Sequence, residues 1–275
     1  MLPHRSPAFL RSYRFLPHRL INRGFAQLTA ARRPSWAIDA AIRLWTRLER
    51  IDLCDFEQRR FESLDDFFLR RLHPGARPLG PGFVAPADGE LVAAGRVERR
   101  ASLTVKKQRL SLERLVNGGQ HAFDVRAYDG ASFATVFLTP RGYHRVHMPI
   151  DGEIREVQWI PGRYFPQNAD ALDHIPRIYE RNERAVLCCR AALGFEFLLI
   201  MVGASLIGGI ELSGIGRSQW VRPTPTRLGW QRAKGEELGC FRFGSTVVVL
   251  LPPGIVHEAT RAAEVRVGQT LFAVC

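Results

Sequence analysis

The strongest constraint in the sequence is an apolar run near the C-terminus that begins at a flexible point. Residues Val247 to Leu251 are all valine or leucine, as in a strand buried on both faces. The run follows Gly244, Ser245 and Thr246, and glycine permits backbone conformations that are closed to other residues. Taken alone, this tripeptide is most simply a turn before a core strand. It also places a small nucleophile where the backbone can bend sharply.

Turn signals divide the C-terminal two thirds of the chain into short apolar segments. Asp-Gly and Pro-Gly pairs, such as Asp151-Gly152, separate runs rich in β-branched and aromatic residues. Only Leu112 to Val116, with Ser111 as N-cap, is expected to form a helix in this region. Strands are expected over residues 90–97, 132–138, 143–148, 153–160, 185–190, 196–202, 205–212, 241–251 and 265–274. The expected fold class is therefore α+β, mostly β.

The N-terminal region differs, because it is strongly basic and follows a helical pattern. Of the formal net charge of +12, +8 lies in residues 1–50, where ten arginines face two acidic residues. Apolar residues recur at helical spacing over residues 7–28, with a break at Pro17, and again after Ser35, a candidate N-cap. The apolar face of the second helix comprises Ile38, Ala41, Ile42, Trp45 and Leu48. Basic amphipathic helices of this kind lie in the interface of anionic membranes.

Two other interpretations of this basic region can be weighed. The helices could pack as a hairpin on the rest of the chain, or the charge could bind nucleic acid. No nucleic-acid motif accompanies the arginines, so no nucleic-acid partner is expected. A short helix over residues 63–72 and a stretch rich in Pro and Gly over residues 74–82 follow. They predict a helical, membrane-associating region over residues 1–73 and a β-rich domain, the candidate catalytic domain, over residues 83–275.

Neither a membrane span nor a secretory signal is expected. The longest nearly uncharged apolar run, Phe197 to Ile210, is too short to cross a bilayer, and arginines interrupt every apolar run near the N-terminus. The five cysteines are odd in number and lack the spacing of zinc sites, which indicates free thiols in a reducing compartment. The sequence thus predicts a peripheral protein on the cytoplasmic face of the cell membrane.

Reactive side chains accompany turns or strand ends at three places. Asp88 lies in the turn Pro86–Gly89, His144 and His147 are three residues apart in a strand-like segment, and Ser245 precedes the apolar run. On a regular strand, residues three apart point to opposite faces, so the two imidazoles converge only if the segment bends. Each site alone has an ordinary structural explanation as a turn former or a hydrogen-bonding group.

Two kinds of chemistry fit these side chains in part. Two histidines and an aspartate could bind zinc, but Ser245 would then have no role, and no Cys or Glu stands at ligand spacing, so no metal is expected. Asp, His and Ser also permit a hydrolase triad, in which Asp orients His and His activates Ser. The segment Phe243–Val247 lacks the second glycine of the Gly-x-Ser-x-Gly hydrolase motif, which weakens the hydrolase but leaves an activated serine open.

Together these segments resemble the phosphatidylserine decarboxylase family, of the bacterial type. Pro86–Gly89, Tyr143–Pro149 and Phe243–Val247 occur in the order and at the separations of its motifs. The resemblance runs from about residue 36 to near the C-terminus, with one mild departure, Phe243 where leucine is expected. Further matching stretches are Phe67–Leu72 with Arg77 and Pro78, Ser111–Leu115, Arg181–Arg184, Val202–Ala204 and Lys234–Gly239.

The resemblance implies a proenzyme that cuts itself. Ser245 would attack the carbonyl of Gly244, and elimination from the resulting ester would give a β chain of residues 1–244 and an α chain of residues 245–275 that stay associated. Ser245 would become a covalent pyruvoyl group, which takes the place of pyridoxal phosphate as electron sink. That group would form a Schiff base with phosphatidylserine from an anionic membrane, and loss of carbon dioxide would yield phosphatidylethanolamine.

The resemblance also implies roles for the other three residues. Asp88 would hold His147, His147 would remove protons from Ser245 during self-cleavage, and His144 would deliver a proton to carbon after decarboxylation. The two histidines could exchange these roles, because their order does not follow from the sequence. The resemblance is also compatible with a homodimer. A Ser-His-Asp lipid hydrolase and a non-catalytic membrane-binding β-domain are the alternative functions.

Overall fold

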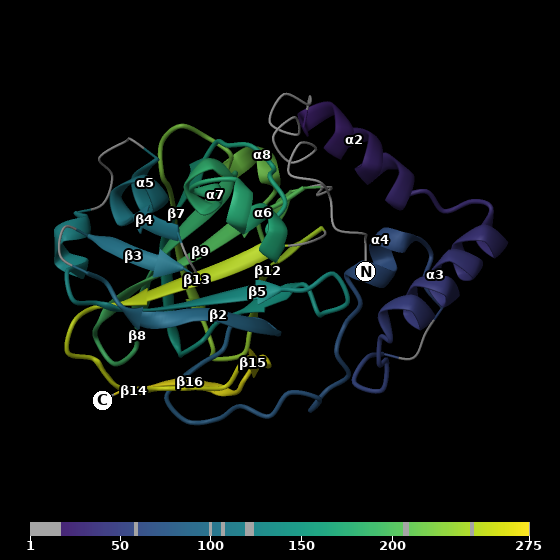
Figure 1. Ribbon diagram of the computed structural model, residues 1–275. Helices are drawn as coiled ribbons and strands as arrows, with labels where there is room; N and C mark the ends of the chain where they lie inside the picture. The colour runs from purple at the N-terminus through teal and green to yellow at the C-terminus, as the bar shows by residue number, and fades with distance from the viewer. Residues whose placement is uncertain are drawn as a thin grey trace.

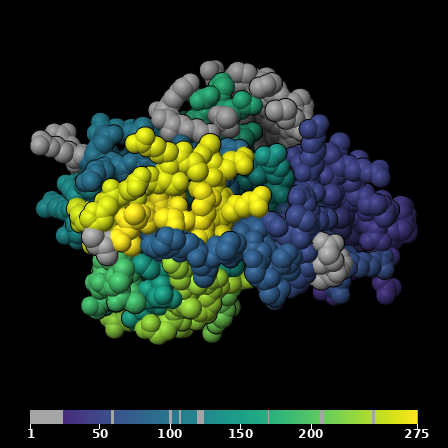
Figure 2. Space-filling model, turned by 90° about the horizontal axis from the view of Figure 1, so that it is seen from below, coloured from purple at the N-terminus to yellow at the C-terminus, as the bar shows by residue number. Residues whose placement is uncertain are grey.

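Strands dominate the part of the chain that the computed structural model describes. This part comprises residues 18–57, 60–98, 101–105, 108–118, 124–205, 209–242 and 245–274, with the backbone alone for residues 18–23 and 169. The predicted α+β, mostly β fold class is confirmed. The N-terminal helices lie together at one side of a body built from β-sheets (Figure 1). Seen from below, the C-terminal strands cover much of the lower face of that body (Figure 2).

An antiparallel sheet of eight strands forms the centre of the fold. In spatial order it contains β11 (Thr226–Arg232), β7 (Gly152–Ile160), β8 (Arg184–Ala191), β9 (Glu196–Gly203), β13 (Ser245–Leu251), β5 (Ser132–Leu138), β2 (Gly89–Arg96) and β15 (Glu264–Val265). Antiparallel neighbours need only short connections, which agrees with the many turn signals in the sequence.

Smaller sheets accompany the large one. The first contains β10 (Ile210–Leu212), β12 (Glu237–Phe241) and β6 (Arg145–His147). The second contains β1 (Phe83–Val84), β16 (Thr270–Val274) and β14 (Val256–Ala259), and the third is the hairpin of β3 (Ser102–Val105) and β4 (Gln108–Ser111). Two strands expected as continuous are each divided. The strand expected over residues 241–251 is divided between the end of β12, in the small sheet, and β13, in the large sheet. The strand expected over residues 265–274 is divided into β15 and β16 by residues 266–269.

Strand β13 is buried on both faces of the large sheet, as predicted. It pairs with β5 on one side and with β9 on the other along nearly its whole length. Alternate side chains enter different hydrophobic cores: Val247, Val249 and Leu251 one core, Val248 and Leu250 the other. A continuous apolar run is what such a strand requires, because neither face meets water.

Short helices pack against both faces of the large sheet, most of them on the face of Val248 and Leu250. The expected helix is confirmed as α5 (Leu112–Asn117), and Ser111 Oγ caps it by accepting from Arg114 N. The expectation of a single helix in this region is wrong. Additional helices are α6 (Ala169–His174), α7 (Ile178–Arg181), α8 (Arg217–Trp220) and a 3-10 helix (Val125–Tyr128). Each is one or two turns long, too short for apolar periodicity to reveal it.

The N-terminal region contains α2 (His18–Thr29), α3 (Ser35–Glu49) and α4 (Leu64–Phe68). The expected start of α4 is confirmed, because Ser63 Oγ accepts a hydrogen bond from Asp66 N at 3.0 Å. The expected cap of α3 is wrong, because Ser35 is already helical and the residue before it is Pro34, which has no side-chain acceptor. The part of the first expected helix that precedes His18 lies outside the described residues.

The apolar side chains of α3 point in two directions. Ile38 and Ile42 are buried in a cluster with Phe67, and the Trp45 ring contacts both Phe67 and Phe68. Part of the face predicted to enter a membrane therefore holds α3 on α4 instead. Three large apolar side chains of α3 are exposed: Trp36, Leu44 and Leu48, at 72%, 59% and 69%. Among the described helices, none has the length and apolar character needed to span a membrane.

Candidate active site

The aspartate turn and the serine come together at one end of the large sheet. Across β2, β5 and β13 the register aligns Glu90 with Phe137 and Phe137 with Thr246. Ser245 and the turn that contains Asp88 consequently stand at the same level, separated by β5. Two segments more than 150 residues apart in sequence thus reach one site.

The histidine segment reaches the same end of the sheet through backbone hydrogen bonds. His147 N donates to Pro86 O at 2.8 Å, and Phe241 N donates to His144 O at 2.9 Å. Only Arg145–His147 is strand, so the segment is not a regular strand across both histidines. Phe241, the hydrogen-bond partner of His144, is the last residue of β12, and Ser245, the first residue of β13, follows four residues later.

Ser245 opens β13 with a side chain that is 0% exposed. Because side chains alternate along a strand, Ser245 Oγ shares the face of Val247, which is covered by β6 and β12. Ser245 Oγ has no hydrogen-bond partner among the described residues. Most buried hydroxyl groups have a partner, whereas the Ser245 hydroxyl is not held by a hydrogen bond within the described chain that would oppose its reaction. Gly244, on the other side of the expected scissile bond, lies outside the described residues.

His144 is held as a neutral imidazole. It is fully buried, and its Nδ1 lies 3.1 Å from Gly142 O. Because a carbonyl oxygen only accepts, Nδ1 carries the proton and Nε2 carries the lone pair. Nε2 is buried without a partner in the described chain, and the Phe68 ring lies against the imidazole, tilted by 39° with the ring centroids 4.0 Å apart. Burial, followed by the charge of Arg70, lowers the pKa of His144 to about 3.

His147 has the same tautomer in a more open environment. Its Nδ1 donates to Gly235 O at 2.8 Å, so its Nε2 accepts the 2.8 Å hydrogen bond from the Tyr143 hydroxyl. The side chain is partly exposed and lines a cavity of 210 Å³. Burial lowers the pKa of His147, although the Gly235 carbonyl and the charges of Glu237 and Asp88 act in the opposite direction.

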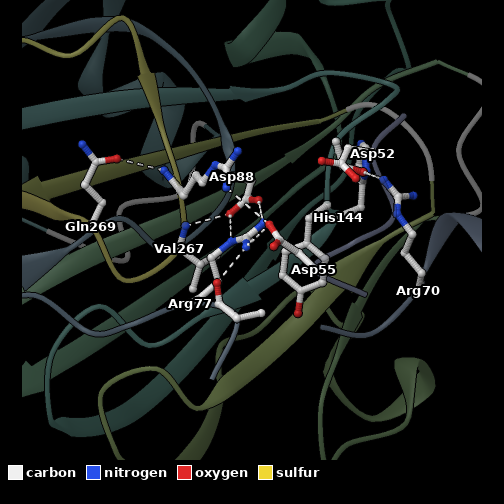
Figure 3. A network of polar contacts seen from close by, with 12 residues as sticks. Asp52, Asp55, Arg70, Arg77, Asp88, His144, Val267 and Gln269 are labelled. Atoms are coloured by element: carbon white, nitrogen blue, oxygen red, sulfur yellow. Dashed lines mark hydrogen bonds and ion pairs between the residues drawn. The ribbon is translucent and has the colours of Figure 1, made fainter. Parts of the chain in front are cut away.

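Asp88 has other partners than the one expected. Its Oδ2 forms an ion pair with Arg77 Nη2 at 2.7 Å, and its Oδ1 accepts from Val267 N at 2.7 Å (Figure 3). Arg77 also forms an ion pair with Asp55 at 2.6 Å. The hydrogen bond expected between Asp88 and His147, two residues that the structure describes fully, is not formed, because the buried Arg77 guanidinium occupies the carboxylate. Asp88 influences His147 by its charge.

Three side chains contact the candidate residues in ways that the sequence does not predict. The Tyr143 hydroxyl forms a hydrogen bond with His147, Arg77 forms an ion pair with Asp88, and Arg70 is buried next to the histidine segment. Both arginines lie in stretches that match the family, but arginines are ordinarily expected on the surface. Within the described ranges, no three His, Cys, Asp or Glu side chains group as metal ligands would.

The buried neutral state of His144 predicts a loss of stability in mild acid. The imidazole titrates at pH 6.5 when unfolded and at about 3 when folded, so the unfolded chain binds the proton first. Between these values, this group should lower the free energy of unfolding by about 1.4 kcal/mol for each pH unit of acidification. Urea denaturation of uncut Ser245→Ala protein at several pH values measures the slope. His144→Gln should make the dependence of the free energy of unfolding on pH less steep, whereas replacement of the exposed His257 by Gln should not. The same slope in His144→Gln and in the parent protein would contradict the neutral buried state of His144.

Comparison with known proteins identifies the family of the chain. The family model described as "Phosphatidylserine decarboxylase" matches residues 64–273, which include all four candidate residues. A relative from Pseudomonas aeruginosa named phosphatidylserine decarboxylase proenzyme is 35% identical over 286 residues, which cover 96% of each chain. Proteins of the same name from Stenotrophomonas maltophilia and Methylibium petroleiphilum are 34% and 36% identical, over 93% and 90% of this chain and 95% and 91% of theirs.

These matches distinguish between the functions that the sequence left open. A decarboxylase is a carboxy-lyase, so the matches favour an enzyme over a non-catalytic β-domain and a decarboxylase over a lipid hydrolase. The family match extends over most of the chain, and each relative is similar along nearly its whole length. The chain belongs to the phosphatidylserine decarboxylase family.

Proposed function

We propose that this chain is a proenzyme that cuts itself between Gly244 and Ser245 and then converts phosphatidylserine to phosphatidylethanolamine. The observation that carries the proposal is a pair of buried polar atoms, Ser245 Oγ and His144 Nε2, that have no hydrogen-bond partner in the described chain. The segments that carry them reach the same end of the large sheet. A serine hydroxyl that is not engaged elsewhere can attack the preceding carbonyl. Membership of the family, and the word proenzyme in the names of relatives, supports both steps.

Self-cleavage would use residues of this chain alone. The Ser245 hydroxyl would replace its own amide nitrogen on the Gly244 carbonyl, and elimination from the ester would release the chain that ends at Gly244 as a carboxylate. Residue 245 would be left as dehydroalanine, which water would hydrolyse to the pyruvoyl group with loss of ammonia. We assign the proton transfers to His147, whose Nε2 can take up a proton through the Tyr143 hydroxyl. The charge of Asp88 favours the protonated imidazole. In the alternative assignment, His144 performs these transfers.

The surroundings of Ser245 suit a pyruvoyl group derived from it. Leu138 of β5 and Gly203 of β9 pair with residue 245 from both sides, so the backbone would stay in place after the preceding bond is cut. Such a group supplies a carbonyl that takes up the amine of the substrate and the electron pair left by carbon dioxide. His144 Nε2, unprotonated in the uncut chain, can accept a proton from the ammonium group of the substrate and return it to carbon.

Borohydride tests the proposal, because it reduces a reactive carbonyl. Purified wild-type protein is incubated with vesicles that contain phosphatidylserine, and carbon dioxide and phosphatidylethanolamine are measured. Borohydride should abolish the activity and change the mass of the fragment of residues 245–275 alone. Serine-directed phosphonates, which inactivate serine hydrolases, should have no effect. An uncut chain that still decarboxylates, or an activity that survives borohydride, would overturn the proposal.

We propose in addition that the N-terminal helices bind an anionic membrane surface. A diacyl lipid leaves a bilayer only at a cost of about 0.8 kcal/mol for each methylene group, so the enzyme must approach the bilayer. On α3, the exposed side chains of Trp36, Leu44 and Leu48 alternate with exposed Arg43 and Arg47. Apolar side chains can enter the membrane interface while neighbouring arginines contact anionic headgroups.

Charges placed on the outer side of α3 should weaken membrane binding. We expect Leu44→Asp with Leu48→Asp to reduce co-sedimentation with vesicles containing phosphatidylserine at least ~10-fold, because two leucines lose their burial in the bilayer. The control is Leu193→Asp, since Leu193 is 60% exposed on the turn between β8 and β9. Equal binding by the double variant and the control would exclude α3 as a membrane contact.

A further inference from the structure

Arg70 is a buried cation that the proposed chemistry does not use. It follows α4 and is 1% exposed, and it forms no ion pair with a carboxylate of the described residues. Its guanidinium lies over the rings of Phe56 at 4.4 Å and Phe67 at 5.2 Å. Burial lowers the pKa of Arg70 to about 10, so it stays protonated at neutral pH. The charge of Asp88 offsets part of this effect without forming an ion pair. A buried charge that lacks an ion pair is costly, which suggests a role beyond packing.

The hydrogen bonds of Arg70 all go to backbone carbonyls, two of them in the histidine segment. Nη1 donates to Phe67 O at 3.3 Å, and Nη2 donates to Arg141 O and Gly142 O, each at 2.7 Å. Gly142 O is also the acceptor for His144 Nδ1 at 3.1 Å. The guanidinium and the imidazole therefore share one oxygen atom, and both side chains appear in Figure 3.

The residues before Arg70 contact the same segment. The Phe68 ring packs at a tilt against the imidazole of His144, and Leu69 O accepts two hydrogen bonds from the Arg145 guanidinium at 3.0 and 2.8 Å. Phe68, Leu69 and Arg70 thus contact, in this order, the His144 ring, the Arg145 side chain and the Gly142 carbonyl. The orientation of His144 depends on this contact, which comes from a part of the chain far away in sequence.

We propose that Arg70 is a positioning residue for His144. It fixes the Gly142 carbonyl, which keeps the His144 proton on Nδ1 and leaves Nε2 as the free acceptor. This inference rests on the proposed function, because a fixed Nε2 matters for proton transfer. Arg70 acts through His144 and needs no contact with the substrate.

The charge of Arg70 acts in the same direction as its hydrogen bonds. A nearby cation disfavours a second proton on an imidazole, and Arg70 is the largest cause of the low pKa of His144 after burial itself. The other charges around the segment are paired. Arg145 forms a 2.8 Å ion pair with Glu237 of β12, and Asp88 is paired with Arg77.

Imidazole NMR of the full-length, uncut Ser245→Ala protein with ¹⁵N-labelled histidine tests this inference. His144→Gln identifies the signals of His144. We expect His144 to be neutral, with its proton on Nδ1, from about pH 5 to pH 8. Arg70→Met should produce a mixture of tautomers or a titration within that range. Arg70→Lys should keep the neutral state, because it keeps the charge, but with a weaker preference for one tautomer, since lysine lacks the planar fork.

Several outcomes would overturn the inference. One is a His144 that carries its proton on Nε2 while Arg70 is present, a result that needs no Arg70 variant to fold. Another is an unchanged single tautomer in Arg70→Met. The matched control is Arg71→Met, which removes the exposed neighbouring arginine and should leave the spectrum unchanged. A wild-type chain that is not cut or does not release carbon dioxide would refute the proposed function, whereas the NMR result would stand.

Kinetics of the wild-type background supply a second readout. Arg70→Met should lower kcat on the order of 100-fold with little change in KM, because proton transfer is affected more than substrate binding. The acid limb of its pH profile should also move upward, towards the ordinary histidine range. Arg70→Lys should recover part of the rate. An Arg70→Met enzyme with wild-type kcat and pH profile would overturn the inference.

Discussion

Replacement of Ser245 by alanine is expected to leave the chain uncut and without decarboxylase activity. Alanine has no oxygen to attack the Gly244 carbonyl, and residue 245 can then supply no carbonyl for catalysis. Activity should fall on the order of 10⁶-fold, the scale seen when a catalytic nucleophile is removed. The fold should tolerate the change, because the buried Ser245 hydroxyl has no partner in the described chain to lose.

Intact mass spectrometry measures this prediction. The wild-type protein should give one chain that ends at Gly244 and one of residues 245–275 whose N-terminus lacks an amine, and Ser245→Ala should give a single mass for residues 1–275. The matched control is Ser132→Ala, because Ser132 is a buried serine of the adjacent β5 that faces Leu251 at the far end of β13. The control should be cut normally. Cleavage of the Ser245→Ala chain at the same bond would refute the nucleophile.

Glutamine in place of each histidine should separate self-cleavage from turnover. Glutamine keeps a polar side chain but cannot take up or release a proton near neutral pH. We expect His144→Gln to be cut and to decarboxylate roughly 10²- to 10⁴-fold more slowly, the usual contribution of a proton-transferring group. We expect His147→Gln to be cut slowly or not at all. Gel electrophoresis measures the cut fraction over time, and carbon dioxide release measures turnover.

The pattern of the two histidine variants decides between the possible assignments. Exchanged phenotypes would show that His144 acts in cleavage and His147 in turnover. Normal cleavage and normal turnover in both variants would place the chemistry elsewhere. His257→Gln serves as the control, because His257 is exposed on β14 and should affect neither step.

The fold class could be predicted because the physical signals of its strands are local. The apolar run Val247–Leu251 has no polar face, and only a strand covered on both sides accommodates it. The turn signal at Gly244 lies at the break between β12 and β13, but the sequence does not show that the two strands join different sheets, because sheet membership depends on long-range pairing. Helix α6 was also missed, because it depends on the Asn168 cap and on its place against the sheet.

The candidate site shows the same division between local and long-range information. Asp88, the two histidines and Ser245 could be found because each lies in a short motif. Their bonding partners could not, because Arg77 and Asp88 meet only after the chain folds, with Val267 as a third member from the C-terminal segment. Charge counting treats arginines as surface residues, whereas Arg77 is buried between two carboxylates.

The central position of β13 has a consequence for the timing of the proposed cut. Without residues 245–275, the main sheet would have a gap between β9 and β5, each with an open edge. If the chain is cut as proposed, β13 is expected to take its place between β9 and β5 while it is still joined to the rest of the chain, so that folding precedes cutting. Afterwards the fragment would be trapped by strands on both sides. The fragment would be lost only when the sheet opens, so the rate of unfolding, and not the equilibrium stability, would set the lifetime of the enzyme.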